Sequence, residues 1–300
     1  MSLAALEQCL IAPVVPSKID SEQAFHQLWC TEVPHHLSAS EQAVRGGMLA
    51  DRLAWVFAAG YQASLRSAFP FLPPGGWAAY AATEDTHDPE QHPGVTLAAV
   101  EDGFELSGYK SWVGHSRVVE HLVVSINDPD GDKRRARGVV LARSAPGVHL
   151  THRESPAFLS ALSQGYARFD RVPVARGQVF GFEPMRQFGR TEAKFVMLAA
   201  TAFMLVQTPG AAALKDELMA VGATLCLLLT ERETSREAYG ALDRQFQRAV
   251  AAFETKSDMQ LIPDYAADRR MLRMYTERIQ RRAGYARQAR ESGARKQRGS

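Results

Sequence analysis

The spacing of the apolar residues changes twice along this 300-residue chain, and that change constrains the fold more than any single motif. Up to about residue 67, apolar residues recur every three or four positions, which is typical of amphipathic helices. Between residues 77 and 184 they alternate in short runs rich in β-branched residues, and after residue 187 the helical spacing returns. The sequence therefore predicts an α+β protein in which helices flank a central β-domain.

Prolines, glycines and short alternating runs divide the chain further. Pro-Pro-Gly-Gly at the end of segment 69–76 stops any helix. Asp-Gly and Pro-Gly pairs separate short runs that predict an antiparallel barrel or sandwich. The six expected strands are 96–100, 103–108, 121–126, 138–142, 148–152 and 164–169. We expect an N-terminal helical domain (1–76), a central β-domain (77–186), a C-terminal helical domain (187–290) and a disordered tail (291–300).

Composition excludes several classes of protein. A hydrophobic fraction of 46%, a charged fraction of 23% and a net charge of +2 are ordinary for a soluble globular protein. The three cysteines lie far apart without a CxxC pair, and the N-terminus lacks a signal-peptide pattern. No apolar run reaches the length of about 20 residues that a membrane helix needs. We therefore expect a cytoplasmic protein.

Motif searches exclude further functions. The nine histidines show no HExxH or paired Cys/His spacing, so we expect no metal site. We interpret the histidines, among them His87, His115, His121 and His152, as loop residues that face solvent. The chain also lacks the GxSxG elbow of hydrolases, the phosphate loop of P-loop enzymes and the GxGxxG of nicotinamide dehydrogenases.

Two short motifs in the β-region carry the functional hypothesis. YAATE (80–84) precedes the six expected strands, and FELSGYKSW (104–112) ends a hairpin with a tryptophan. APGVHL (145–150) and ARFDRVPVARGQVFG (167–181) follow, and Arg190 opens the last helical region. In this order and spacing the segments resemble the acyl-CoA dehydrogenase superfamily over roughly residues 48–206, as a shortened, divergent member. The resemblance implies N-terminal helices, a β-barrel or sandwich and a C-terminal helical bundle.

The resemblance also implies an FAD cofactor. Tyr80, Ala82 and Thr83 would form one wall of the flavin site and Trp112 the other, because a flat isoalloxazine ring needs aromatic contact and polar groups at its edge. Gly114 stands where the family carries a threonine or serine that bonds flavin N5. The alternative is that Trp112 is a buried core aromatic of the β-domain.

Several positions depart from the family pattern. A glycine-rich loop is replaced by residues 85–94, which place acidic side chains where a pyrophosphate or CoA would approach. The C-terminal segments that help to hold FAD, and the late loop with the usual base, are not evident. Too few residues follow Arg190 for four long helices with those segments.

Glu192 is the nearest candidate for the catalytic base, although a carboxylate near a helix start is also favoured by the helix dipole alone. Arg190 would pair with a CoA phosphate or with a surface carboxylate.

Three functional hypotheses follow. The first is α,β-dehydrogenation of an acyl-CoA or carrier-bound acyl thioester, with hydride transfer to FAD, in a homodimer or tetramer. Helical segments 195–206 and 218–229 would supply the subunit contact, and an electron-accepting flavoprotein is one candidate acceptor. The second is a degenerate member that acts as a binding or partner subunit without its own base. The third is nucleic-acid binding by the basic segment 269–298, which we disfavour because such a segment is more often a solvated face.

Overall fold

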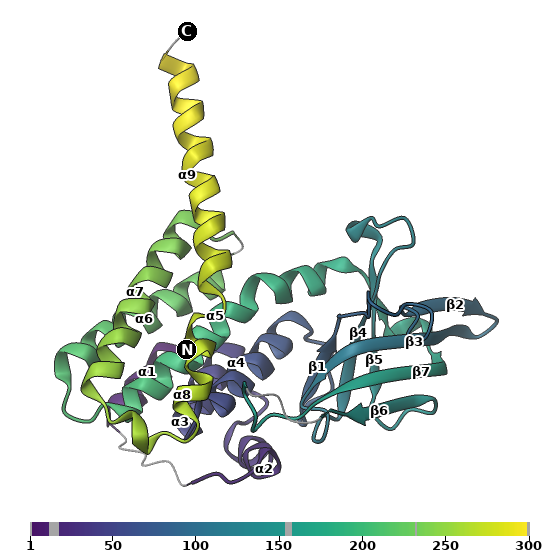
Figure 1. Ribbon diagram of the computed structural model, residues 1–300, viewed down its shortest axis with the longest axis horizontal. Coiled ribbons are helices and arrows are strands. Elements are labelled where there is room, and N and C mark those ends of the chain that lie inside the picture. The colour runs from purple at the N-terminus through teal and green to yellow at the C-terminus, as the bar shows by residue number, and fades with distance from the viewer. Residues whose placement is uncertain (1, 12–17, 154–157, 232, 299–300) are drawn as a thin grey trace. The chain divides into compact units, whose positions relative to one another are not determined.

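The computed structural model describes residues 2–11, 18–153, 158–231 and 233–298 (Figure 1). The chain forms two compact units. The helical unit comprises residues 1–18, 40–60 and 193–300, and the β-unit comprises residues 19–39 and 61–192. Among the described residues, none of the helices has both the length and the apolar character needed to cross a membrane.

The N-terminal region is helical, as the apolar spacing predicted. Its helices are α1 (Ser2–Ile11), α2 (Glu22–Glu32), α3 (Ala39–Leu49) and α4 (Leu53–Ala68). The Ser21 hydroxyl begins α2 by accepting a hydrogen bond of 3.1 Å from the backbone N–H of Ala24. This contact satisfies one of the free N–H groups at the start of the helix.

The described residues of the β-unit contain all six predicted strands and two short additional ones. The strands are β1 (Ala78–Ala81), β2 (Thr96–Val100), β3 (Gly103–Gly114), β4 (His121–Ile126), β5 (Arg137–Ala142), β6 (Val148–His152), β7 (Gln164–Val174) and β8 (Val179–Phe180). They form two four-stranded sheets with the orders β1-β4-β5-β8 and β2-β3-β7-β6. The strands of the second sheet can be followed by their labels in Figure 1. Pairing is antiparallel except between β1 and β4.

The two sheets form a sandwich and do not close into a barrel. Residues from both sheets share one apolar cluster, in which Ala79, Leu122 and Val139 come from the first sheet and Val113 and Phe169 from the second. The inward positions alternate along each strand, which is the pattern that predicted the sandwich.

A bulge interrupts β3 near its end. The pairing of β3 with β7 shifts between Lys110 and Val113, so that Ser111 and Trp112 lie outside the regular register. Lys110 and Val113 are buried, whereas Ser111 and Trp112 are half-buried. A bulge turns side chains away from the alternation of the strand, and here it turns Trp112 out of the sandwich core.

The described C-terminal residues form four long helices, whereas we expected too few residues after Arg190 for four such helices with the FAD-holding segments. They are α5 (Phe182–Gln207), α6 (Ala212–Thr230), α7 (Arg236–Lys256) and α9 (Thr276–Arg298). The short elements are η1 (Lys133–Arg135), η2 (Arg176–Gln178), η3 (Met259–Leu261), α8 (Tyr265–Asp268) and η4 (Arg269–Arg273). The expectation about the helices was wrong because α5 begins before Arg190 and short turns join α5, α6 and α7. Helix α9 also includes most of segment 291–300, for which we had expected disorder.

Helix α5 packs backbone against backbone within the helical unit. A Cβ atom on Gly47 of α3 would lie 2.2 Å from the Ala199 carbonyl oxygen, and one on Gly60 of α4 would lie 2.4 Å from Val196 Cα. Only glycine permits such close approach. Residues 195–205 of α5 are 0–4% exposed in the single chain, so this segment cannot supply the subunit contact that its apolar character suggested.

Candidate functional site

The two motifs that carry the functional hypothesis lie side by side in the β-unit. The Ser111 N–H donates a hydrogen bond of 2.8 Å to the Thr83 carbonyl. The Lys110 ammonium lies 2.6 Å from Glu84 Oε1 and 3.3 Å from the Ala82 carbonyl oxygen. The loop after β1 is therefore fastened to the end of β3 by one backbone bond and one ion pair.

Lys110 is an unusual residue for the interior of a strand. Its side chain is 0% exposed, and burial lowers its pKa, while the hydrogen bond and charge of Glu84 act in the opposite direction. Glu84 Oε1 also accepts from the Val95 N–H at 3.2 Å, and Glu84 Oε2 accepts from Asn127 Nδ2 at 3.0 Å. A buried cation is tolerated when a carboxylate with further hydrogen bonds faces it. Sequence reasoning missed this pair, although both residues lie inside the quoted motifs.

Trp112 lies beside the core and is not part of it. Its indole N–H donates a hydrogen bond of 3.1 Å to Gln164 Oε1 on β7. The apolar cluster of the sandwich contains the next residue, Val113, and not Trp112. The interpretation of Trp112 as a buried core aromatic therefore does not fit the structure.

The indole covers Gly114. A Cβ atom on Gly114 would lie 3.0 Å from Trp112 Cη2 and 3.3 Å from Cζ2, which is closer than most side chains tolerate. A threonine or serine at this position would press against the ring in its present orientation. Gly114 thus supplies no side-chain donor but leaves space for the indole.

Tyr80 takes part in an aromatic group on the other side of its sheet. Its ring lies 5.0 Å from that of Phe188 and 5.8 Å from that of Phe69. Its backbone N–H donates to the Tyr61 hydroxyl at 2.8 Å. Burial raises the pKa of both the Tyr61 and Tyr80 phenols, so both are neutral at physiological pH.

On helix α5, Glu192 is half-buried whereas Arg190 is exposed. Phe188, which packs on Tyr61 and Tyr80, precedes Glu192 by four residues, so the two lie on one face of the helix. After burial and a backbone hydrogen bond, the charge of Glu192 also acts on the pKa of Tyr61 and raises it. Arg190 is exposed, and its charge contributes to the lowered pKa of Glu183 after that of Arg186. The structure therefore brings Glu192, but not Arg190, towards the β1 side of the predicted site.

Carboxylates of the acidic loop 85–94 accept hydrogen bonds from the backbone of the same loop. Asp85 Oδ1 accepts from the His87 N–H at 2.9 Å, and this bond is the main reason that the pKa of Asp85 is lowered. Asp88 Oδ1 accepts from the Gln91 N–H at 3.2 Å, and Asp85 Oδ2 lies 3.2 Å from His92 Nδ1. Amides that could face an anion are thus directed at side chains of the loop itself.

His115 is buried, which corrects its interpretation as a solvent-facing loop residue. It is 1% exposed with φ of 56°, and its Nδ1 lies 2.9 Å from Glu22 Oε1. Glu22 Oε2 in turn accepts from the Ser163 N–H at 3.1 Å. His115 therefore ties helix α2 to the end of the β2-β3-β7-β6 sheet. No motif signals this role, because Glu22 lies 93 residues away along the chain.

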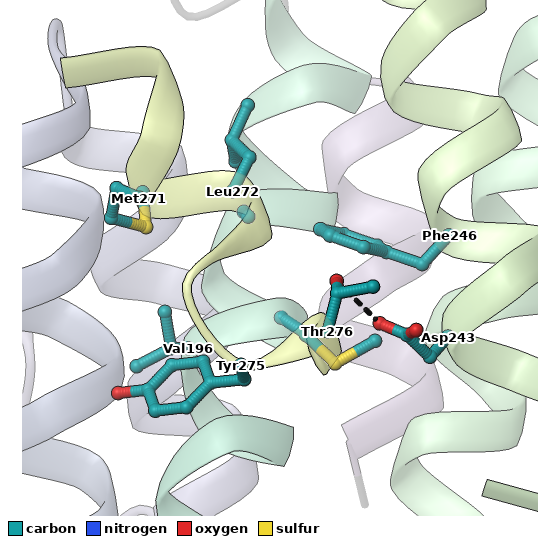
Figure 2. A pocket seen from close by; sticks show the side chains of 9 residues that line it. Val196, Asp243, Phe246, Met271, Leu272, Tyr275 and Thr276 are labelled. Carbon is teal, nitrogen blue, oxygen red and sulfur yellow. Dashed lines mark hydrogen bonds between the residues drawn. The ribbon is translucent and has the colours of Figure 1, made fainter. Parts of the chain in front are cut away.

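A separate pocket occurs in the helical unit. Figure 2 shows Val196 from α5, Phe246 and Asp243 from α7, and Tyr275 and Thr276 near the start of α9 around it. Thr276 Oγ1 donates to Asp243 Oδ1 at 3.0 Å, and Gln280 Nε2 donates to Asp243 Oδ2 at 2.6 Å. Both carboxylate oxygens thus have neutral donors, and the pocket contains none of the residues predicted for the site.

Known proteins resemble this chain in structure but give no match to its sequence. No protein-family model matches the sequence, and none of the curated proteins matches it. In contrast, the prolyl acyl carrier protein oxidase AnaB aligns over 93% of this chain and 96% of its own, with 13% identity and a TM-score of 0.64. Butyryl-CoA dehydrogenase from Megasphaera elsdenii aligns over 95% of both chains, with 14% identity and a TM-score of 0.64. The chain has the acyl-CoA dehydrogenase fold.

The acyl-CoA dehydrogenase fold agrees with the resemblance seen in the motifs. A third structure, described as PigA with FAD and proline, aligns over 98% of this chain and 93% of its own, with 12% identity and a TM-score of 0.56. At such identity the fold is shared while most side chains differ, so each functional residue has to be argued on its own.

Proposed function

We propose that this chain is a flavin-dependent oxidoreductase of acyl-CoA dehydrogenase type that binds FAD. The observation that carries the proposal is the hydrogen bond between Ser111 and Thr83, which holds the Thr83 loop against the strand end that bears Trp112. A half-buried indole beside an exposed threonine offers a flat aromatic surface and a hydroxyl group. Those are the two features that a flavin ring requires.

The residues of the two motifs fit FAD in unequal ways. Trp112 and Thr83 would contact the ring directly, and Tyr80 would support the wall through its packing on Phe188. Ala82 would contribute only its small side chain to the wall, because Lys110 already engages its carbonyl oxygen. Gly114 would leave hydrogen bonding at the ring edge to backbone groups.

The proposed reaction is α,β-dehydrogenation of an acyl thioester carried by CoA or by a carrier protein. When bound, FAD supplies the acceptor for the hydride that leaves the β-carbon. The Glu192 carboxylate would take the proton from the α-carbon, and the electron pair of that C–H bond forms the new double bond. Arg190, being exposed, would pair with a phosphate of the substrate.

Flavin binding is the direct test. Freshly purified protein should absorb near the flavin maxima, or take up FAD on titration with quenching of flavin fluorescence. Trp112→Ala should weaken FAD binding by about tenfold or more, because it removes the aromatic contact. The matched control is Tyr166→Ala, which removes an aromatic side chain of β7 that is 40% exposed. A colourless protein that takes up no FAD contradicts the proposal.

A second candidate function is that of a binding or partner subunit without its own catalytic base. The missing side-chain donor at Gly114 favours it. Protein loaded with FAD should then fail to reduce an artificial electron acceptor with any acyl thioester. If turnover is observed and Glu192→Gln lowers kcat at least 100-fold while FAD affinity is unchanged, the enzymatic proposal stands and this alternative is excluded.

A further inference from the structure

Three basic side chains gather at one end of the β-unit. Arg117 follows β3, Arg143 follows β5 and His152 ends β6. Arg143 Nη1 donates to the Arg117 carbonyl at 2.7 Å, which holds the two arginines together. After burial, the charges of Arg117 and Arg143 are the next causes that lower the pKa of His152. Residues from three separate connections thus form one cationic cluster, in which the two arginines carry the charge and His152, with its lowered pKa, is mainly neutral above pH 6.5.

Among the residues that the structure describes, neither Arg117 nor Arg143 forms an ion pair with a carboxylate. In the described part of the β-unit, ion pairs engage other arginines, such as Arg135 with Asp130 and Arg186 with Glu183. The acidic residue that acts on His152 is Glu22, and both of its oxygens are engaged by His115 and the Ser163 N–H. Adjacent cations without a counter-ion repel each other, and a bound anion removes that cost.

The backbone holds the cluster in place without using all of its donors. The Arg117 N–H donates to Ser163 Oγ at 2.9 Å, and the Arg143 N–H donates to the Glu120 carbonyl at 2.8 Å. Ser116 is fully buried, and its hydroxyl lies 3.0 Å from His152 Nδ1, which leaves Nε2 of the ring for a ligand. The Arg117 guanidinium makes none of these contacts. An arginine fork with open donors is suited to phosphate oxygens.

The cluster lies next to the indole of the proposed flavin site. Gly165 pairs with both Val113 of β3 and His152 of β6, and a Cβ atom on it would lie 3.0 Å from Ser116 Cβ. Its neighbour Gln164 accepts the hydrogen bond from Trp112. One residue therefore separates the partner of the indole from the cationic cluster.

We propose that Arg117, Arg143 and His152 bind the diphosphate group of an adenine nucleotide ligand, with Ser116 as a positioning residue for His152. In loop 85–94, by contrast, the N–H groups of His87 and Gln91 already donate to carboxylates of the loop itself. FAD and CoA both carry an adenosine diphosphate group. The choice between these two sources rests on the proposed function, whereas the anion site does not.

ADP is the smallest probe that contains the shared group. Calorimetric titration of the full chain should show ADP binding that weakens with rising salt and is not seen with adenosine. Arg117→Gln removes only the guanidinium and should weaken ADP binding about tenfold or more, as expected for charge-assisted hydrogen bonds. Arg168→Gln removes an exposed arginine of β7 and should leave ADP binding unchanged. Circular dichroism and thermal unfolding should show that both variants are folded.

Titrations with FAD, riboflavin and CoA identify the source. Loss of FAD affinity in Arg117→Gln, with riboflavin binding unchanged, supports the site with FAD as its ligand. Loss of CoA affinity alone supports the site with CoA as its ligand. ADP binding that depends on Arg117 in a chain that binds no flavin also supports the site and overturns the proposed function. ADP binding that is absent from the wild type, or equal in Arg117→Gln and Arg168→Gln, overturns the anion site.

Discussion

The two units of the chain differ in the groups that titrate near neutral pH. All nine histidines lie in the β-unit, and the helical unit has none. Burial lowers the pKa of three of them, His26, His121 and His152. The chain therefore concentrates its sensitivity to mild acid in the unit that carries the proposed site.

Several carboxylates of the two units are stabilised in different ways, although the helical unit also contains one buried ion pair, Asp51 with Arg52. In the β-unit, Glu84 faces the Lys110 ammonium and Glu22 faces the His115 ring. In the helical unit, Asp243 is held by Thr276 and Gln280, which are neutral. Removal of the Glu84 carboxylate should therefore cost more than removal of the Asp243 carboxylate, because it leaves the Lys110 ammonium buried without a partner.

The largest expected effect is that of Glu84→Gln. It leaves the fully buried Lys110 ammonium without a carboxylate, and we expect the free energy of unfolding to fall by about 3 kcal/mol or more. Denaturant unfolding measures the loss, and Glu90→Gln in the same exposed loop is the matched control. A loss equal to that of the control would contradict the role given to the ion pair.

The pH dependence of Glu84→Gln gives a second readout. Burial lowers the pKa of Lys110 below its ordinary 10.5, and loss of the carboxylate should lower it further. Between the lowered and the ordinary pKa the folded chain binds fewer protons than the unfolded chain, so stability rises with pH. The defect should therefore shrink between pH 7 and pH 10. A defect that does not change with pH would show that Lys110 stays charged.

Asp243→Ala should have the next largest effect. It leaves Thr276 Oγ1 and Gln280 Nε2 without their shared acceptor beside the pocket of Figure 2, at an expected cost of about 2 kcal/mol. Asp243→Asn keeps one acceptor and should cost less, and Asp216→Ala on the exposed face of α6 is the control. Hydrogen exchange should rise in α7 and α9. A rise confined to the β-unit would contradict the assignment.

Mild acid should weaken the β-unit through its histidines. A histidine whose folded pKa is lowered costs no stability above the ordinary value of 6.5, and stability is lost as pH falls below it towards the folded pKa. His26 is faced by Trp77, Cys30 and Glu120, and by the charge of His115. Its replacement, His26→Gln, should reduce the loss of denaturation midpoint between pH 7.5 and 5.5. His87→Gln, at an exposed position, should not reduce it.

The smallest effects should come from the helix caps, one in each unit. Ser21 caps α2 in the β-unit and Ser235 caps α7 in the helical unit, each accepting from a backbone N–H three residues on. Ser21→Ala and Ser235→Ala should each cost about 1 kcal/mol, whereas the glycine variants should cost only a few tenths. Hydrogen exchange should rise in α2 for the first variant and in α7 for the second. A loss shared equally by both helices would contradict the division into units.

The order of helices and strands was predictable because it depends on local spacing. Runs such as 121–126 and 148–152 match β4 and β6 residue for residue. The resemblance to the acyl-CoA dehydrogenase superfamily implied that the Thr83 loop lies near Trp112, and the hydrogen bond between Ser111 and Thr83 agrees with it. The start of α5 was placed too late, since Glu183 and Pro184 do not show the helical apolar spacing.

Contacts between distant segments were not predictable from one sequence. Asp243 meets Gln280 only because α7 and α9 pack in one register, and that register depends on the whole bundle. The cluster of Arg117, Arg143 and His152 likewise needs three connections to end at the same edge. Lys110 is the exception, because a lysine at an inward position of an alternating strand indicates from sequence alone that a buried partner faces it.

The indole of Trp112 occupies the space that a side chain at position 114 would need. A redesign that restores a hydroxyl at position 114 would have to move or shrink the ring in the same step. These two positions should thus vary together in any lineage or library that keeps the chain functional, and single replacements at either one would misrepresent what the pair tolerates.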